Sequence, residues 1–354
     1  MKILVIRLSA MGDIVLCLPV LRAALKQNID LQIDLLTRPS LAPVFAHIER
    51  LQVLNLDVDN DYAGLRGLFN LSSILNKNKY DMVLDLHDVL RTKVLCAFLH
   101  HSGRKIYRID KERKAKRSVL GKLYKMQVEL HHTTWRYAQV FRRAGIQLSL
   151  EPHNLNEQGI VQDQLAIHKI NRWIKMLPPS TAGIVGVAPF SQHRLKEYPL
   201  ERIQQILQHR LINTADVIVL FGQGPREREG MMMLQNSDPS RIFLSMDHFN
   251  LEEEIVLMSR LKFMLTMDSA NMHLAELSGC PQVISVWGPT HTVLGFAPYF
   301  SNTDHVVEIA PKELSCRPCS MYGQKPCQRG DHACMTMLTP ESIMNKLSNI
   351  SDDL

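Results

Sequence analysis

The sequence predicts an α/β protein with two doubly wound parallel sheets, each in its own domain. Short apolar segments alternate with helical apolar patterns along the chain, which is typical of parallel sheets covered by helices. The chain has 354 residues, too many for a single hydrophobic core. A polar, turn-rich segment at residues 151–159 separates two series of such elements. We therefore expect domains over residues 1–157 and 158–337, followed by a C-terminal helix within residues 338–354.

The chain opens on the predicted first strand. Ile3–Ile6 is a fully apolar run with β-branched residues, which predicts a strand buried on both faces. A turn of small residues (SAMG) leads to Asp13, and a helical apolar pattern covers residues 14–25. Asp13 is therefore expected beside the carboxyl end of a parallel strand, where open α/β sheets bind ligands. Two interpretations stay open for Asp13: a cap of the helix, or a general base that faces a ligand.

The rest of the first half continues the alternation. We expect strands at residues 31–36, 51–56, 80–86 and 105–109, and helices at residues 41–46, 65–76 and 91–99. His87 and Asp88 directly follow the third of these strands, and Arg91 begins the next helix. These side chains are expected at the same sheet edge as Asp13.

An acidic segment at residues 57–61 (DVDND) allows two interpretations. It is either an Asp-x-Asp metal motif or an ordinary acidic turn after a strand. A calcium loop is excluded, because Tyr62 stands where that loop needs glycine and Leu68 where it needs glutamate.

The net charge of +6 is concentrated in one segment, Arg104–Arg117, which contains eight lysines and arginines against two acids. Such a segment suits a ligand with carboxylates or phosphates. We expect no nucleic-acid partner, since the segment is poor in aromatic residues and no nucleic-acid-binding module surrounds it. No apolar run reaches the ~18 residues of a transmembrane helix. Polar residues interrupt any signal peptide at the opening, so we expect a cytoplasmic protein.

The second half restarts the alternation. We expect strands at residues 183–187, 216–221, 263–266 and 282–286, and helices at residues 162–176, 200–208, 226–234, 251–260, 271–278 and 339–347. The loop after the first of these strands carries Ser191, Gln192, Arg194 and Lys196. It is interpreted either as a cradle for an anion or as a solvated loop.

A glycine turn precedes a charged helix at residues 221–230 (FGQGPREREG). The turn lacks the third glycine of a dinucleotide fingerprint and the Lys-Ser/Thr pair of a P-loop. Glu227 and Glu229 are either ribose acceptors or favourable charges in the first turn of the helix.

A stronger signal lies at residues 266–279 (TMDSANMHLAELSG). A strand ends at Asp268, small residues follow, and a helix begins near Asn271. The free N–H groups at such a helix start bind anions, which favours a diphosphate ligand. His273 adds a donor one turn further along.

The sequence resembles the ADP-heptose–lipopolysaccharide heptosyltransferases over essentially its whole length. The shared motifs are IRLSAMGD at residues 6–13, DLHDVLRTKVL at 85–95, LKEYP at 195–199, FGQGPRERE at 221–229, MDSANMHLAELSG at 267–279 and WGPT at 287–290. The resemblance implies the GT-B architecture: two Rossmann-like domains that face a central cleft, and a C-terminal helix that returns toward the first domain. Ala270 stands where the family usually has glycine, which would reshape the phosphate loop slightly.

The resemblance also implies an activity, the inverting transfer of heptose from ADP-heptose to a hydroxyl group of the lipopolysaccharide inner core. Asp13 resembles the base that removes the proton of the acceptor hydroxyl. Lys196 resembles the lysine that binds the donor diphosphate and offsets the charge on the leaving ADP. The implied donor site comprises Ser191, Gln192, Lys196, Glu227 or Glu229, Asp268, Ser269, Ala270, Asn271 and His273. The implied acceptor site comprises Ser9, Met11, Gly12, His87, Arg91, Arg113, Lys114 and Arg117.

Partners and location follow from the same resemblance. The ADP-sugar is a co-substrate, no metal or other cofactor is expected, and the protein is expected to be a monomer. The segment Arg104–Arg117 would meet the anionic inner core at the inner face of the inner membrane, where each basic residue near an anionic surface adds about 1 kcal/mol. Other classes stay open: a GT-B relative such as an epimerase or a transferase of another nucleotide sugar, and a non-catalytic protein that binds glycans or nucleic acid. A pure binding protein would not need an acid at position 13.

Four of the seven cysteines form a C-terminal pattern, C-x2-C-x7-C-x6-C. They are Cys316, Cys319, Cys327 and Cys334. Three states stay open for them: a structural zinc site, reduced thiols that pack a loop, or a disulfide.

Overall fold

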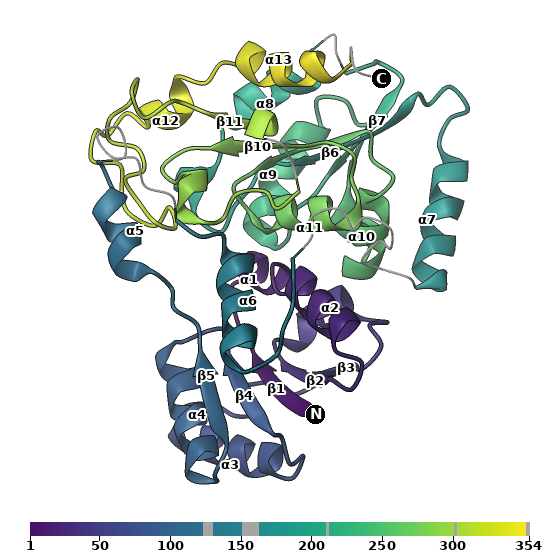
Figure 1. Cartoon of the computed structure of the whole chain (residues 1–354). Helices are drawn as coiled ribbons and strands as arrows, with labels where there is room; N and C mark the ends of the chain where they lie inside the picture. Colours follow the sequence, from purple (N-terminus) through teal and green to yellow (C-terminus); the bar gives the residue numbers. More distant parts are fainter. Residues whose placement is uncertain (123–129, 151–162, 210–211, 301–302, 352–354) are drawn as a thin grey trace. The chain divides into compact units, whose positions relative to one another are not determined.

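The computed structural model describes residues 1–122, 130–150, 163–209, 212–300 and 303–351 (Figure 1). The chain divides into two compact units, Met1–Lys111 with His131–Leu155, and Glu112–Leu130 with Asn156–Leu354. Each unit contains one parallel sheet with helices on both faces, so the predicted α/β class is confirmed. The predicted boundary segment, residues 151–159, lies outside the described residues.

The first unit has a five-stranded parallel sheet of order β3-β2-β1-β4-β5. Its strands are β1 (Lys2–Ile6), β2 (Gln32–Leu36), β3 (Leu51–Leu54), β4 (Met82–Asp85) and β5 (Lys105–Arg108). The chain begins in the centre, moves out to β3, and returns to β4 on the other side of β1. The strand order therefore reverses between β1 and β4, and open α/β sheets bind ligands at such a switch point.

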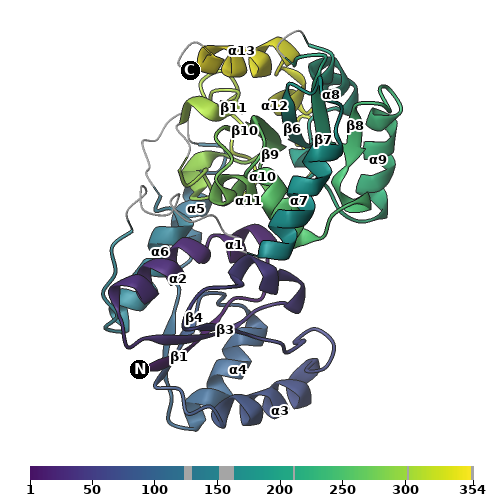
Figure 2. The same cartoon turned by 90° about the vertical axis from the view of Figure 1, so that its right-hand side faces the viewer.

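Helices cover both faces of this sheet (Figures 1 and 2). The helices α3 (Gly64–Asn76) and α4 (Leu90–His101) cover one face, and α2 (Leu18–Gln27) and α6 (Thr133–Arg143) cover the other. The first face is held by an apolar core in which Leu68 and Leu71 of α3 pack against Leu4 and Val83 of the sheet. Helix α6 was not predicted from the sequence.

The helix predicted over residues 14–25 is wrong as one element. The structure has two helices there, α1 (Met11–Val15) and α2, and α2 begins with Pro19 in its first turn. Proline has no N–H group and its ring clashes with a preceding helical turn, so it ends one helix and starts another. The short helix predicted over residues 41–46 is the 3₁₀ helix η1 (Pro39–Phe45).

The second unit has a six-stranded parallel sheet of order β11-β10-β9-β6-β7-β8. Its strands are β6 (Gly183–Ala188), β7 (Asp216–Leu220), β8 (Ile242–Leu244), β9 (Phe263–Met267), β10 (Val283–Trp287) and β11 (Val306–Glu308). The short strands β8 and β11 were not predicted. The order reverses between β6 and β9, which makes the carboxyl ends of these two strands the second switch point.

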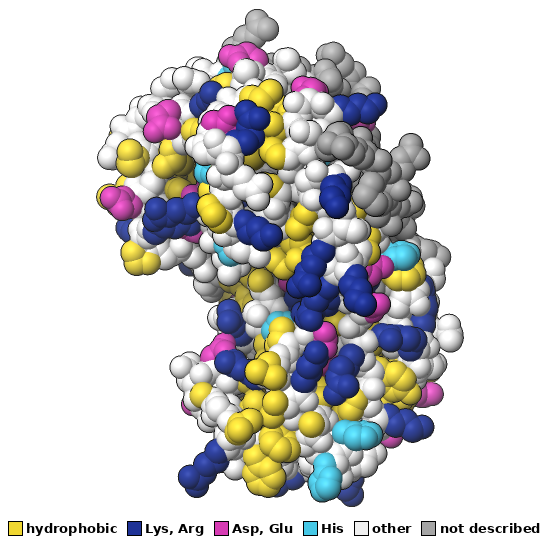
Figure 3. Space-filling view, turned by 90° about the vertical axis from the view of Figure 1, so that its left-hand side faces the viewer, with side chains coloured by type: hydrophobic (Ala, Val, Ile, Leu, Met, Phe, Trp, Pro, Cys, Tyr) yellow, Lys and Arg dark blue, Asp and Glu magenta, His cyan; other side chains and the backbone are white. Residues whose placement is uncertain are grey.

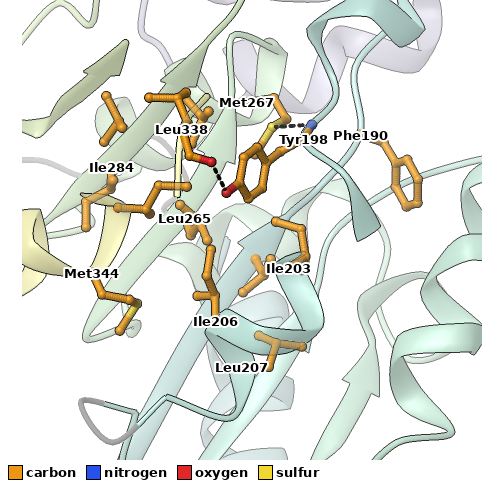
Figure 4. Close-up of a cluster of buried hydrophobic side chains, with 14 of the residues drawn as sticks. Phe190, Tyr198, Ile203, Ile206, Leu207, Leu265, Met267, Ile284, Leu338 and Met344 are labelled. Atoms are coloured by element: carbon orange, nitrogen blue, oxygen red, sulfur yellow. Dashed lines mark hydrogen bonds between the residues drawn. The ribbon is translucent and has the colours of Figure 1, made fainter. Parts of the chain in front are cut away.

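Two groups of helices cover this second sheet. One group is α8 (Leu200–Leu207), α9 (Pro225–Gln235) and α13 (Pro340–Ser351), and the other is α7 (Gln164–Met176), α10 (Leu251–Met258) and α11 (Ala270–Ser278). Figure 4 shows the core under the first group, where the hydroxyl of Tyr198 donates to the carbonyl of Leu338 at 2.7 Å. Ile343 and Met344 of α13 are fully buried in that core. The helix is therefore part of the core of the second unit, and its return toward the first domain stays a prediction.

The basic segment Arg104–Arg117 is divided between the two units, which differs from the predicted first domain of residues 1–157. Its second part forms α5 (Arg113–Val119), which belongs to the second unit. Lys116 of α5 is buried, and its Nζ lies 4.2 Å from the ring centroid of Phe296. The N–H of Gly121 donates to the carbonyl of Pro318 at 2.7 Å. These contacts attach α5 to the second unit. In the part of the chain that the structure describes, no helix is long and apolar enough to span a bilayer.

Candidate active site

Asp13 lies at the switch point of the first sheet and is paired with Arg7. Nη2 of Arg7 is 2.5 Å from Oδ2 of Asp13, and Nη1 of Arg7 donates to the carbonyl of Leu86 at 2.7 Å. The side chain of Arg7 is 5% exposed and that of Asp13 is 22% exposed. Arg7 therefore ties the ends of β1 and β4 together and fixes a carboxylate that remains partly open to solvent.

The backbone at Asp13 is fixed as well. The hydroxyl of Tyr137, on α6, donates to the carbonyl oxygen of Asp13 at 3.0 Å, and the Tyr137 ring centroid lies 5.7 Å from the Arg7 guanidinium carbon. The N-cap of α1 is Ala10, and Asp13 is the third residue of the helix. The interpretation of Asp13 as the cap residue is therefore wrong.

The turn after β4 places His87 at the same switch point. Oδ1 of the buried Asp85 accepts from the N–H groups of His87 and Asp88 at 3.0 and 2.9 Å. Oδ2 of Asp85 accepts from the hydroxyl of Thr92 at 3.0 Å. One buried carboxylate thus defines the turn and the start of α4.

The surroundings of His87 disfavour its charged form. Burial, together with the positive charges of Arg7 and Lys111, lowers the pKa of His87 to about 3. Its Nε2 lies 3.3 Å from Oγ of Ser9, which joins the two strand ends of the switch point. The structure therefore brings Ser9, Met11, Gly12, Asp13 and His87 together in the first unit, on α1, the turn before it and the turn after β4.

Arg91 lies in a separate ionic cluster with the acidic turn. Asp59 pairs with Arg91 and, at 3.1 Å, with Nε of Arg38. Oδ1 of Asp57 accepts from the N–H groups of Asp59 and Asn60 at 2.9 and 3.1 Å. Within the described ranges, no three side chains of His, Cys, Asp or Glu come together as a metal site. These contacts favour the ordinary acidic turn over the metal motif.

The other predicted acceptor residues, Arg113, Lys114 and Arg117, are exposed on α5 and belong to the second unit. The structure therefore does not gather them in the unit that contains Asp13.

Lys196 forms the corresponding ion pair at the second switch point. Its Nζ is 2.8 Å from Oδ2 of Asp268, and the two side chains are 12% and 9% exposed. The same carboxylate oxygen accepts from the hydroxyl of Thr290 at 2.6 Å. The hydroxyl of Ser191, which follows β6, donates to the carbonyl of Asp268 at 3.2 Å.

The start of α11 adjoins this ion pair. Its N-cap is Ser269, which follows Asp268 directly and makes no side-chain capping bond. The first N–H groups of the helix are therefore left for another acceptor, and the helix dipole favours an anion there. Ala270 is the first residue of α11 and does not have a positive φ, so alanine fits this position without reshaping the loop. Asn271 is half-buried and His273 is buried on the same helix.

Two neighbouring segments fix the position of Lys196. It ends the 3₁₀ helix η4 (Arg194–Lys196), and Glu197 next to it pairs with Arg226 at 2.8 Å. The stem of Lys196 lies against Gly323: a Cβ there would lie 2.5 Å from both Cγ and Cδ of the lysine. Gly323 also has a φ of +81°, so glycine is required for its conformation and for the space it leaves.

The two candidate ribose acids differ in their surroundings. Glu227 is half-buried, its Oε2 accepts from the N–H of Gln223 at 2.9 Å, and burial raises its pKa. Glu229 is exposed, as is Gln192 in the loop after β6. The geometry favours Glu227 near the end of β7, and its contact with a ribose stays a prediction.

The cysteine-rich segment supports the loop that carries Thr290. Arg317 is fully buried, donates to the carbonyls of Gly288 and Thr290 at 2.6 and 2.9 Å, and pairs with Glu308 at 3.0 Å. The four cysteines are free thiols in the structure. Burial raises the pKa of Cys334 to about 11. A zinc site at these cysteines stays untested.

The fold and the two switch points are those of a two-domain Rossmann-like protein of the GT-B class. The chain belongs to glycosyltransferase family 9 (heptosyltransferase), whose profile matches residues 68–324. Among curated protein sequences, none matches this chain.

Several solved structures share the fold. The glycosyl transferase family 9 protein of Veillonella parvula superposes with a TM-score of 0.76 at 18% identity, over 100% of this chain and 98% of that chain. E. coli ADP-heptose lps heptosyltransferase II gives 0.68 at 17% identity, over 100% of both chains. E. coli heptosyltransferase WaaC with ADP gives 0.65 at 16% identity, over 99% of both chains. The predicted family and fold are confirmed.

Four residues that shape the two sites were not predicted as site residues: Arg7, Tyr137, Thr290 and Gly323. Arg7 could have been predicted from the sequence, because it follows four apolar strand residues at the carboxyl end of β1. Tyr137 and Gly323 lie in segments where no element was predicted, and their partners are distant in sequence.

Proposed function

We propose that this protein transfers heptose from ADP-heptose to a hydroxyl group of the lipopolysaccharide inner core, with inversion at the anomeric carbon. Membership of family 9 supports the class of reaction. One observation carries the rest: the ammonium group of Lys196 lies beside the uncapped start of α11, at the switch point of the second sheet. A sugar diphosphate matches this pair of groups in charge and in hydrogen bonding.

The second unit would act on the leaving group. The ammonium of Lys196 has N–H groups beyond the one directed at Asp268, and these can donate to phosphate oxygens. As the bond between the anomeric carbon and the diphosphate oxygen breaks, its electron pair passes to ADP. Lys196 and the N–H groups of α11 would stabilise the charge that develops on the diphosphate.

The first unit would act on the acceptor. The carboxylate of Asp13 would take the proton of the acceptor hydroxyl while the hydroxyl oxygen forms the new bond to the anomeric carbon. Arg7 contacts Oδ2 of this carboxylate, and the other oxygen would receive the proton. A single displacement of this kind inverts the configuration.

The remaining features of the proposal concern partners. The ADP-sugar serves as co-substrate, and we propose that no metal or other cofactor takes part and that the protein works as a monomer. The exposed cations Arg113, Lys114 and Arg117 support binding of an anionic acceptor at the inner face of the inner membrane.

A nucleotide panel followed by a product assay tests this function. ADP should raise the melting temperature of the protein more than UDP, GDP or CMP does. With ADP-heptose and a heptose-free core acceptor, the protein should release ADP and add one heptose to the acceptor, with or without a chelator. Turnover of a different nucleotide sugar, with no use of ADP-heptose, would reject the donor assignment. Loss of turnover on chelation, with recovery when metal is added, would reject metal independence.

A further inference from the structure

The paired helices α3 and α4 expose an apolar surface on the first unit. Leu65 and Phe69 of α3 are 68% and 56% exposed, and Leu90 of α4 is 80% exposed. Leu65 and Phe69 are four residues apart, as are Leu90, Val94 and Phe98, so each set forms one stripe along its helix. The rings of Phe69 and Phe98 meet edge to face with centroids 5.6 Å apart, which joins the two stripes into one surface, here called the α3–α4 surface.

This surface is not needed for the core of the first unit. The helices already bury their opposite faces, with Leu68 and Leu71 of α3 and Leu95 and Leu99 of α4 packed in the core. Large exposed apolar side chains that adjoin one another are unusual on a soluble protein and mark a surface that binds something.

The two chain segments that form the α3–α4 surface carry an excess of positive charge. Residues 62–80 and 89–109, which contain both helices, include no aspartate or glutamate. They carry eight cations: Arg66, Lys77, Lys79, Arg91, Lys93, Arg104, Lys105 and Arg108. Three of these are paired with acids outside the two segments, Arg91 with Asp59, Lys93 with Asp88 and Arg108 with Asp85. The other five leave the surface with a net positive charge. Figure 3 faces the α4 side of this unit and shows hydrophobic side chains gathered there, with lysine, arginine and histidine side chains and fewer acidic ones around them.

We propose that the α3–α4 surface docks the protein on an anionic phospholipid bilayer. Exposed leucine and phenylalanine on helices that carry basic and no acidic residues match a bilayer surface, where apolar groups enter the interface and cations meet anionic headgroups. A second copy of the chain is a poorer match, because a twofold contact through this face would bring like charges together. The inference rests on the proposed function in one respect: a lipid-linked acceptor gives the enzyme a reason to bind a membrane.

Vesicle flotation of the full chain tests this surface. The vesicles contain phosphatidylethanolamine and phosphatidylglycerol and no glycolipid acceptor, and vesicles of phosphatidylcholine serve as the neutral comparison. The wild type should bind the anionic vesicles, and the double variant L65S/L90S should bind at least about tenfold more weakly, because two exposed leucines lose their transfer into the interface. The matched control is L165S, since Leu165 is 82% exposed on α7 of the second unit. The control should bind as the wild type does.

Other results would overturn the proposal. Equal vesicle binding by L65S/L90S and the wild type would reject the α3–α4 surface, and absence of wild-type binding would reject the membrane as its partner. A dimer seen by light scattering in the wild type and lost in L65S/L90S, without vesicle binding, would assign the surface to a second copy. The melting temperature of L65S/L90S should match that of the wild type, and its response to ADP should be unchanged. If ADP does not raise the melting temperature but vesicle binding still depends on Leu65 and Leu90, the proposed function would be rejected. The docking surface would then stand without it.

Discussion

Each of the two switch points contains an ion pair, Arg7 with Asp13 in the first unit and Lys196 with Asp268 in the second. The proposed functional group is the acid in the first pair and the cation in the second. In the first unit the cation is the buried partner, because Arg7 is 5% exposed while its partner Asp13 is 22% exposed. In the second unit both partners are largely buried, Asp268 at 9% and Lys196 at 12% exposed, and the acid also accepts a hydrogen bond from Thr290. One edge therefore presents a carboxylate, and the other presents an ammonium group.

This reversal assigns different chemistry to each unit. A carboxylate fixed by a buried guanidinium can accept a proton. An ammonium fixed by a buried carboxylate attracts a diphosphate and cannot act as a base while it is charged. The two halves of the proposed transfer, proton removal and departure of ADP, thus need opposite charges at equivalent places of two similar sheets. The predictions below test whether the two sites are as separate as this comparison requires.

Removal of Lys196 should affect both turnover and ADP binding. Lys196→Ala should lower turnover about a hundredfold, as loss of one donor to a developing anion does, and raise the Kd for ADP at least about tenfold. Calorimetry with ADP and steady-state kinetics measure the two quantities. Lys175→Ala, an exposed lysine on α7, is the matched control and should change neither. Unchanged ADP affinity in Lys196→Ala would show that the second switch point does not bind the diphosphate.

Arg7→Lys should disturb only the first site. Lysine keeps the charge but has one nitrogen in place of Nη1 and Nη2, which contact the carbonyl of Leu86 and the carboxylate of Asp13 separately. We expect kcat to fall about tenfold, equivalent to ~1.4 kcal/mol of transition-state stabilisation. The Kd for ADP should stay as in the wild type. Arg143→Lys, an exposed arginine of the same unit, is the control. A kcat for Arg7→Lys equal to that of the control would show that Arg7 does not contribute to catalysis.

The two units should also differ in how pH changes their stability. Folded His87 has a pKa of about 3 against 6.5 for the free side chain, so protons bind the unfolded chain preferentially and this group lowers stability as pH falls from 6.5 toward 3. Burial raises the pKa of Glu254 to about 7 from 4.5, so its contribution is present at low pH and is lost as pH rises from 4.5 through 7. Denaturant unfolding at several pH values measures the free energy of unfolding. Glu254→Gln should lose the pH dependence between 4.5 and 7, and His87→Gln should lose that between 3 and 6.5. Each lost slope is at most ~1.4 kcal/mol per pH unit. Two variants with the wild-type pH profile would contradict both assignments.

Gly323→Ala should have a smaller and more local effect. The new Cβ would displace the stem of Lys196, and we expect the Kd for ADP to rise about threefold, or ~0.7 kcal/mol. Gly330→Ala is a close control, because Gly330 also has a positive φ, of +78°, but a Cβ there would meet nothing within 4 Å. Both variants should lose stability through backbone strain, by about 1 kcal/mol. A similar loss of ADP affinity in both would mean that strain, and not contact with Lys196, is responsible.

The fold was predictable from the sequence because each strand is a short apolar run and each helix has apolar residues at helical spacing. Ile3–Ile6 and the strand before Asp268 follow directly from that pattern. The exceptions also have local causes: Pro19 divides the first helix, and β8 and β11 have only three residues each. The division of the basic segment was not predictable, because it depends on the contact of Lys116 with Phe296, which is far along the chain.

The sites were predictable where a residue stands at the end of a strand, as Asp13, His87, Ser191 and Asp268 do. Their partners were not, because pairing across a switch point joins residues distant in sequence, such as Ser191 with Asp268 and Arg7 with Leu86. Local patterns do not contain that information. Topology supplies it, through the reversal of strand order between β1 and β4 and between β6 and β9.

Turnover of Asp13→Asn tests the central claim most directly. Asparagine keeps the size of the side chain and cannot take a proton, so we expect a folded protein that binds ADP as the wild type does and turns over at least about a hundredfold more slowly. Asp88→Asn is the matched control at the same switch point, since the positive φ of Asp88 also suits asparagine. That variant should stay within about threefold of the wild type, far from the effect of losing a general base. Turnover of Asp13→Asn within about threefold of the wild type would contradict the account, because the acceptor would then be activated by a group other than Asp13.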